Sequence, residues 1–141
     1  MKINWGAIGL AAIVHFGFGA VWFSTFGAAW RAGTRLSPEE LQTYMSHPNP
    51  WPYFVGFLCS LGMALVISCV IGVQCRYGLI SGGIAGLMVG LACALAMITE
   101  MAFEMRTANF MMISGGYPLL GCILMGLVIG VWKPKGVEAQ A

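Results

Sequence analysis

Long runs of apolar residues, separated by short polar segments, dominate the pattern along this chain. Four runs cover about residues 3–30, 51–74, 77–99 and 107–132. Each run predicts a transmembrane helix, because a helix needs roughly 20 apolar residues to cross the hydrocarbon core of a bilayer. Four crossings return the chain to the side of the membrane on which it started. The pattern therefore predicts an all-α fold, a polytopic membrane four-helix bundle.

One polar segment, residues 31–50, is long enough to hold structure of its own. Within it, Ser37 is followed by Pro38 and, three residues after the serine, by Glu40, which is the pattern of a capped helix start. We expect one short surface helix in this first loop, ending at about Ser46. Three apolar residues fall along one side of it and suit a membrane surface: Leu41, Tyr44 and Met45.

Composition supports the membrane assignment for the whole chain. Of its 141 residues, 59% are hydrophobic and 9% are charged, whereas soluble domains contain roughly 45–50% apolar and about 25% charged residues. The length suits a single domain, residues 1–133, followed by a short flexible tail, residues 134–141. A net charge of +2 is too small and too scattered for a nucleic-acid surface. Membrane lipid is the expected contact instead.

The distribution of lysine and arginine predicts the orientation. The side that carries both termini holds Lys2, Arg76, Lys133 and Lys135, and the opposite side holds Arg31, Arg35 and Arg106. Positive charge is enriched on the cytoplasmic side of membrane proteins. The difference of one charge therefore favours a multi-pass protein of the cell membrane with both termini in the cytoplasm.

The chain carries no recognisable catalytic or metal-binding motif. Its five cysteines show neither CxxC spacing nor a cysteine–histidine ligand pattern. No nucleophile–base constellation, Walker loop or dinucleotide fingerprint appears. We therefore expect no enzyme activity, no metal and no cofactor, and we interpret the cysteines as small packing residues.

Small residues recur every four positions in the last three runs, which predicts closely packed helices. Lipid gives apolar helices little drive to associate, so close contact depends on such stripes. The stripes comprise Gly56, Ser60, Ala64, Ser68 and Gly72; Gly78, Gly82, Gly86, Gly90 and Ala94; and Ser114, Cys122, Gly126 and Gly130. With three stripes in four helices, one of them is a candidate contact between subunits, and we single out residues 82–94 for this role.

His15 is a polar residue in the middle of the first run. It shares a helix face with the small residues Ala11 and Gly19, so we expect it to point into the bundle. Ionisable residues inside a membrane are typical of proton paths and ligand contacts. The alternative is a neutral imidazole that is hydrogen-bonded to a backbone carbonyl or to a hydroxyl group such as that of Ser60 or Ser68.

Two glutamates close the third run and form the main charged cluster. Glu100 and Glu104 share one helix face, where like charges repel each other. Arg106 does not face Glu104 on a regular helix, so relief requires a helix break, a proton, a cation or another subunit. The segment Gly115-Gly116-Tyr117-Pro118 predicts a kinked helix or a partly re-entrant segment beside them, and interrupted helices near ionisable groups are typical of binding sites. The alternative is a solvated interfacial loop.

The candidate ligand-binding residues combine this charged cluster with its expected neighbours at the same depth of the membrane. They are Glu100, Glu104, Arg106, Asn109, Tyr117, Trp22 and Ser24. His15 is a separate candidate, because it lies about 15–20 Å from Glu100 along the membrane normal.

Several segments together carry a family resemblance. They are Asn4-Trp5, Gly19-Ala20-Val21-Trp22-Phe23-Ser24, Trp30, Ser37-Pro38-Glu39-Glu40-Leu41, Gly116-Tyr117, Trp132 and, most specifically, Glu100-x-x-Phe103-Glu104-x-Arg106. This set resembles the domain of unknown function 1761 family over nearly the whole chain. The resemblance implies a small four-helix membrane protein, in most cases of the bacterial inner membrane. It implies no activity.

Three functions remain open on the sequence. We favour a packing or accessory subunit, in a homo-oligomer or a larger membrane complex, because the small-residue stripes suit close contacts. The first alternative is an oligomeric pathway for a small solute, an ion or a proton that uses Glu100 and Glu104. The second alternative is a lipid- or quinone-binding module that uses Trp22, Phe26 and Tyr117.

Overall fold

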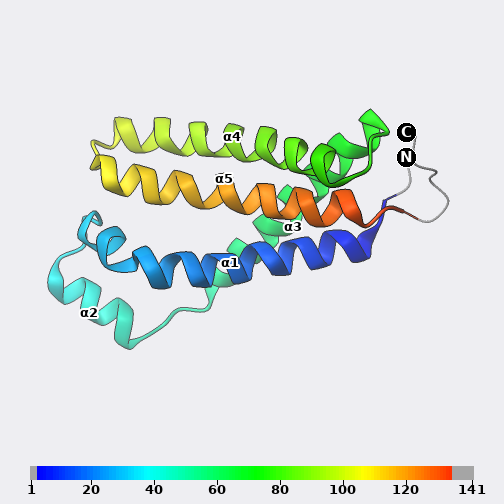
Figure 1. The fold of residues 1–141 in the computed structure, drawn as a ribbon. Helices are drawn as coiled ribbons and strands as arrows, with labels where there is room; N and C mark the ends of the chain where they lie inside the picture. The colour runs from blue at the N-terminus through cyan, green and yellow to red at the C-terminus, as the bar shows by residue number, and fades with distance from the viewer. Residues whose placement is uncertain (1–2, 135–141) are drawn as a thin grey trace.

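The computed structural model describes residues 3–134, which form five helices (Figure 1). Four are long: α1 (Trp5–Ala32), α3 (Trp51–Gln74), α4 (Leu79–Phe103) and α5 (Ala108–Val131). The fifth, α2 (Pro38–Ser46), is short and lies in the first loop. Within residues 3–134 there is no β-strand, and all four long helices are long and apolar enough to cross a membrane. The predicted all-α membrane bundle with one short extra helix is confirmed.

Several helix ends differ from the predicted runs, and two of the differences have a clear cause. α1 begins at Trp5, because the side chain of Asn4 accepts a hydrogen bond from the backbone N–H of Ala7 at 3.2 Å and caps the helix there. α4 ends at Phe103 rather than near residue 99, since apolar residues continue past Glu100. The predicted flexible tail falls almost wholly on residues 135–141, which lie outside the described part of the chain.

α5 is the central helix of the bundle. It contacts α1, α3 and α4, and Figure 1 shows α1, α5 and α4 side by side with α3 crossing behind them. The side-chain amide of Asn4 donates to the backbone carbonyl of Trp132 at 3.1 Å, so the start of α1 and the end of α5 lie at the same end of the bundle. The buried core combines small and aliphatic side chains, among them Ala7, Ala11, Ala64, Ile67, Ile71 and Met125.

The closest helix contact joins α4 and α5 through glycine. A side chain at Gly82 would overlap the backbone carbonyl of Gly126, and one at Gly86 would overlap the carbonyl of Cys122. Only glycine allows two backbones to approach in this way, which is how apolar helices gain contact in lipid. The stripe at residues 82–94 therefore has its partner within the chain, and it is not the free stripe that a subunit contact would need.

α2 begins where the sequence predicts and stands apart from the bundle. The side chain of Ser37 accepts from the backbone N–H of Glu40 at 3.2 Å, and the Glu40 carboxylate accepts from the backbone N–H of Ser37 at 2.8 Å. The backbone bond and then the side-chain bond with Ser37 hold the pKa of Glu40 below its ordinary value. No residue of α2 is buried, so this reciprocal cap, rather than packing, stabilises the helix.

α5 runs without interruption through Pro118, which corrects one expectation. The sequence predicted a kinked helix or a partly re-entrant segment at residues 115–118, but a single helix spans Ala108–Val131. The re-entrant segment is therefore excluded. The turn before the proline is held from outside, because the indole N–H of Trp22 donates to the carbonyl of Ile113 at 3.0 Å. This carbonyl is one residue before that of Ser114, the group that loses its helical donor at Pro118, so the indole bonds the same turn without replacing the missing bond.

The α4–α5 contact can be tested with Gly86→Ala. We expect this change to destabilise the folded protein by about 1–3 kcal/mol, because the added methyl group meets backbone that cannot move aside. The matched control is Gly17→Ala in α1, where a methyl group would meet no atom within 4 Å. Thermal unfolding in detergent measures both, and equal melting temperatures for the two variants would contradict the assigned contact.

Candidate functional site

The structure divides the predicted site residues into two groups. One group lies inside the bundle around His15, and the other lies at the membrane end of α4 around Glu104. Tyr117 belongs to the first group, although the sequence predicted it beside the glutamates. The reason is that continuous α5 carries Tyr117 nine residues from its start at Ala108, which is about 13 Å along the helix axis.

His15 is buried in the centre of the bundle, as predicted, with only 1% of its surface exposed. Its Nδ1 lies 2.8 Å from the hydroxyl oxygen of Ser60. Because the Ser60 hydroxyl donates to the carbonyl of Gly56 at 2.8 Å, its oxygen is left to accept a hydrogen bond from the N–H at Nδ1. That arrangement suits a neutral imidazole. It matches the second interpretation of His15 drawn from the sequence, a hydrogen bond to a hydroxyl group such as that of Ser60. Nε2 then carries a lone pair, and it has no hydrogen-bond partner in the described residues.

Tyr117 packs against His15, close to the same ring nitrogen that contacts Ser60. The two rings lie 4.7 Å apart between centroids, and the tyrosine hydroxyl lies 3.2 Å from Nδ1 of His15 and 3.4 Å from its carbonyl oxygen. Two glycines make room for this pair, since a side chain at Gly19 would press on Tyr117 and one at Gly121 would overlap the imidazole of His15. The sequence thus builds a fitted polar cluster inside an apolar bundle.

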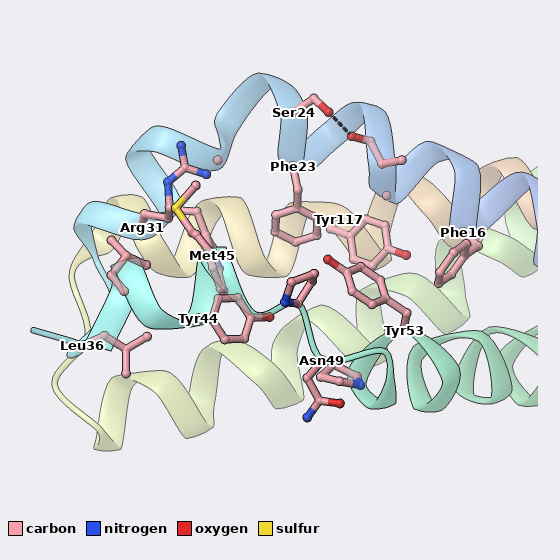
Figure 2. A pocket seen from close by; sticks show the side chains of 17 residues that line it. Phe16, Phe23, Ser24, Arg31, Leu36, Tyr44, Met45, Asn49, Tyr53 and Tyr117 are labelled. Atoms are coloured by element: carbon pink, nitrogen blue, oxygen red, sulfur yellow. Dashed lines mark hydrogen bonds between the residues drawn. The ribbon is translucent and has the colours of Figure 1, made fainter. Parts of the chain in front are cut away.

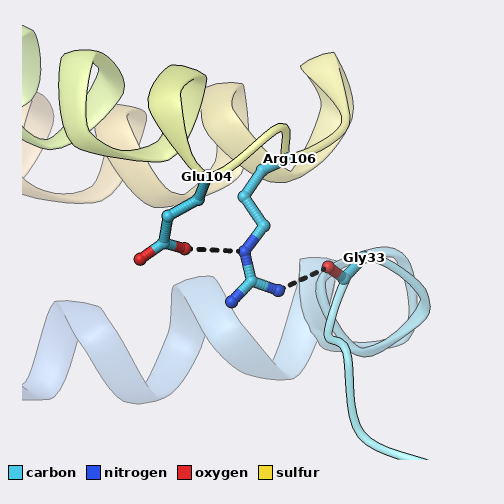
Figure 3. Close-up of polar contacts among 3 residues, drawn as sticks. All are labelled: Gly33, Glu104 and Arg106. Carbon is cyan, nitrogen blue, oxygen red and sulfur yellow. Dashed lines mark hydrogen bonds and ion pairs between the residues drawn. The ribbon is translucent and has the colours of Figure 1, made fainter.

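Arg106 and Glu104 form an ion pair at the end of α4 (Figure 3). The helix stops at Phe103, and Met105 adopts a left-handed conformation with φ of 55°. This break turns the chain so that Nε of Arg106 donates to Glu104 at 2.9 Å. The break at Met105 agrees with the prediction that Arg106 can face Glu104 only where the helix is interrupted.

The same arginine also joins this turn to the end of α1. Nη1 of Arg106 donates to the carbonyl of Gly33 at 3.3 Å, and its guanidinium lies 5.1 Å from the ring centre of Phe110. The Phe110 ring in turn lies against Gly33, so closely that a side chain at residue 33 would overlap it. Glu104 and Arg106 therefore act here as a clamp between two loops.

The remaining predicted residues do not join either group. Glu100 and Asn109 are exposed. The hydroxyl of Ser24 donates to the carbonyl of Ala20 within α1 at 2.5 Å, and the indole N–H of Trp22 donates to the carbonyl of Ile113. Across residues 3–134, no three histidine, cysteine or acidic side chains come together in a set that would hold a metal ion.

A cavity of about 820 Å³ lies between α1, α2 and the start of α3 (Figure 2). Its inner end is formed by Tyr117, where that ring covers His15. Small residues on α1, Gly19, Ala20 and Gly27, leave the space open. Six aromatic side chains contribute to its wall: Phe16, Phe23, Trp30, Tyr44, Tyr53 and Tyr117.

Most residues of this cavity were not predicted from the sequence as site residues. Phe16, Phe23 and Trp30 recur every seven residues, so they lie on one face of α1, and this spacing was the available signal. The contribution of Tyr53 and of the α2 side chains depends on how the first loop folds back, which no local pattern encodes. Trp22 and Phe26, proposed as part of a lipid- or quinone-binding site, lie outside the lining of the cavity.

The clamp can be tested with Arg106→Gln. We expect trypsin to cleave after Arg35 about three- to tenfold faster in this variant, because a charge-assisted bond that holds Gly33 is lost and the loop opens more often. Arg76→Gln removes the same charge from the exposed turn between α3 and α4 and serves as control. Unchanged cleavage in Arg106→Gln would remove the clamp from consideration.

Comparison with known proteins agrees with the resemblance found in the sequence. A family model described as "Protein of unknown function (DUF1761)" matches residues 6–130, which include all five helices except the ends of α1 and α5. The search of curated proteins and the search of solved structures found no match. Because the matched region covers nearly the whole length, the chain belongs to the DUF1761 family of proteins of unknown function.

Proposed function

We propose that this membrane protein binds a hydrophobic or amphipathic molecule from the bilayer in the cavity between α1, α2 and α3. The observation that carries the proposal is the cavity itself, about 820 Å³ of space walled by aromatic rings. Small-molecule sites are typically about 300–1,000 Å³, mostly apolar and equipped with a few polar groups. This refines the second of the alternatives drawn from the sequence, with Tyr117 kept and other residues replacing Trp22 and Phe26.

The depth of the cavity suits a molecule that resides in one leaflet. The 28 residues of α1 span about 42 Å, so Phe16 lies near the middle of the bilayer and Arg31 lies near its surface. The cavity extends between these two residues, a distance of about 22 Å along the helix. Half of the hydrocarbon core and the adjoining headgroup layer have about this thickness.

The position of α2 also favours a bound molecule. Leu41, Tyr44 and Met45 line the cavity, which is the apolar side of α2 recognised in the sequence. No residue of α2 is buried, so without an occupant in the cavity the apolar side chains of α2 would lack apolar contacts. An occupant would supply the apolar contacts that α2 lacks.

The inner end of the cavity offers a hydrogen-bonding group at mid-membrane depth. The hydroxyl of Tyr117 lies there, in contact with His15. A polar group in hydrocarbon is worth more to a ligand than the same group in water, since no solvent competes for it. We propose that the tyrosine limits how deep the molecule enters, and that the role is binding rather than catalysis.

Membership of a homo-oligomer or a larger membrane complex is a second proposal, and the outer side of α3 favours it. Cys59, Gly62 and Val66 are exposed on one face of this helix, and a side chain at Gly62 would meet no atom within 4 Å. Small residues on a lipid-facing surface allow a second helix to approach. This face, rather than the stripe of α4, is where we place the subunit contact.

The ion or proton pathway has less support. Glu104 is neutralised by Arg106, and both belong to the clamp between loops. Glu100 is exposed at the membrane end of α4, where headgroups and water can surround it. We also propose, on the balance of basic residues, that the termini face the cytoplasm of a bacterial cell; the cavity then opens toward the opposite surface.

Filling the cavity tests the main proposal. The probe is phosphatidylcholine with a photoreactive diazirine in one chain, in vesicles that contain the protein. We expect label on residues 16–31 of α1 and on Tyr53. Ala20→Phe should lower this labelling about fivefold or more, because the new ring occupies the space at a cost of about 1 kcal/mol or more to the ligand.

The control for this experiment is Ala29→Phe, which adds the same ring to the opposite, exposed side of α1. Its labelling should equal that of the unmodified protein. Label spread evenly over the lipid-facing surface, or equal labelling of the cavity in both variants, would refute the binding site.

Self-association is tested with the native cysteine of α3. Mild oxidation in the membrane should link two chains through Cys59, which is exposed, and Cys59→Ser should abolish the linked dimer. Cys75→Ser removes another exposed cysteine and should leave the dimer intact. Electrophoresis without reductant reports the result; absence of a dimer, or a dimer that persists in Cys59→Ser, would contradict this face of α3.

A further inference from the structure

Arg31 is the one charged side chain in the described lining of the cavity, and no acidic residue accompanies it there. It lies in the last turn of α1, at the end of the cavity that reaches the membrane surface. The rest of the wall is aromatic, aliphatic or small, with a few neutral polar groups. The cavity is therefore apolar along its length and positively charged at its outer end.

The guanidinium of Arg31 has no acceptor of its own. Among residues 3–134, the structure contains one ion pair, Glu104 with Arg106, and no side-chain hydrogen bond from Arg31. Its Nη1 lies back over Gly27, where a Cβ would come within 3.1 Å, and Met45 lines the same cavity. A planar group with five donors, half-buried against apolar side chains, calls for an anionic partner.

Arg31 differs in this respect from Arg106. Arg106 donates to Glu104 and to the carbonyl of Gly33, so its hydrogen bonds stabilise the fold. The side chain of Arg31 donates no hydrogen bond within the described chain. The favourable position of a cation at a helix C-terminus explains its charge, but not its placement in the wall of a cavity.

We infer that the cavity takes an anionic phospholipid of the surrounding leaflet, with its phosphate at Arg31 and one acyl chain directed toward Phe16 and Tyr117. This inference rests on the proposed function and names its ligand class. A lipid of that leaflet already holds its phosphate near the surface and its chain ends near the bilayer centre, so it enters without a change of depth. Arginine matches phosphate with paired hydrogen bonds.

Two photoreactive lipids with identical diazirine chains test the inference: phosphatidylglycerol, which is anionic, and phosphatidylcholine, which is neutral overall. Both lipids carry a phosphate, but the trimethylammonium group of phosphatidylcholine cancels the phosphate charge and is repelled by Arg31. In vesicles with equal amounts of each, we therefore expect phosphatidylglycerol to label the cavity about tenfold more. Arg31→Gln should reduce this preference to the level of random mixing. Arg35→Gln removes the same charge from the exposed loop four residues later and should keep it.

A competition measurement on the unmodified protein tests the same preference without relying on the folding of a variant. Unlabelled phosphatidylglycerol should displace the phosphatidylglycerol probe about tenfold better than unlabelled phosphatidylcholine does. A photoreactive fatty acid forms a third arm, and stronger labelling by it than by phosphatidylglycerol would assign the site to free carboxylates and overturn the phospholipid.

The outcomes separate this inference from the proposed function. Equal labelling of the cavity by both phospholipids, or a preference that survives Arg31→Gln, overturns the role of Arg31 while leaving the cavity a binding site. A preference lost equally in Arg35→Gln would reflect surface charge alone and would also overturn it. If no probe labels the cavity, the proposed function itself fails.

Discussion

The close approach of α4 and α5 is the constraint on which the rest of the structure depends. In lipid, helices gain little from hiding apolar surface, so stability comes from backbone contact and fitted packing. Gly82 and Gly86 let the two backbones touch, and this fixes α5 as the helix around which α1 and α3 pack. The other face of α5 then presents Tyr117 and Gly121 to His15. The stripe of small residues and the polar cluster are thus two sides of one helix.

The fold was largely predictable from local patterns, whereas the site was not. Four apolar runs gave the crossings, and the spacing of Ser37 and Glu40 gave the start of α2, because caps are decided by neighbours in sequence. The buried position of His15 followed from its small neighbours on α1. Tyr117 was misplaced because a proline and two glycines favour a break, which tertiary packing around Trp22 overrides. The cavity depends on how α2 folds back over α1, and no sequence spacing encodes that.

The most specific sequence motif of the chain therefore has a structural explanation. Glu104 and Arg106 meet because the chain turns sharply at Met105, and the arginine then holds the loop that carries α2. Charged residues near a membrane surface are often interpreted as a transport site, but here their bonds lie within the fold. Among residues 3–134, side-chain groups without a hydrogen-bond partner lie elsewhere: Nε2 of His15 and the hydroxyl of Ser114 inside the bundle, and the guanidinium of Arg31 in the cavity wall.

The order of the helices along the chain has a consequence for biosynthesis. α1 has the lowest mean hydropathy of the four membrane-crossing helices, and it contains an imidazole whose partners Ser60 and Tyr117 are translated 45 and 102 residues later. When α1 leaves the ribosome, neither partner exists. The polar cluster around His15 therefore forms only after α5 has been made, and until then α1 lacks both of these partners.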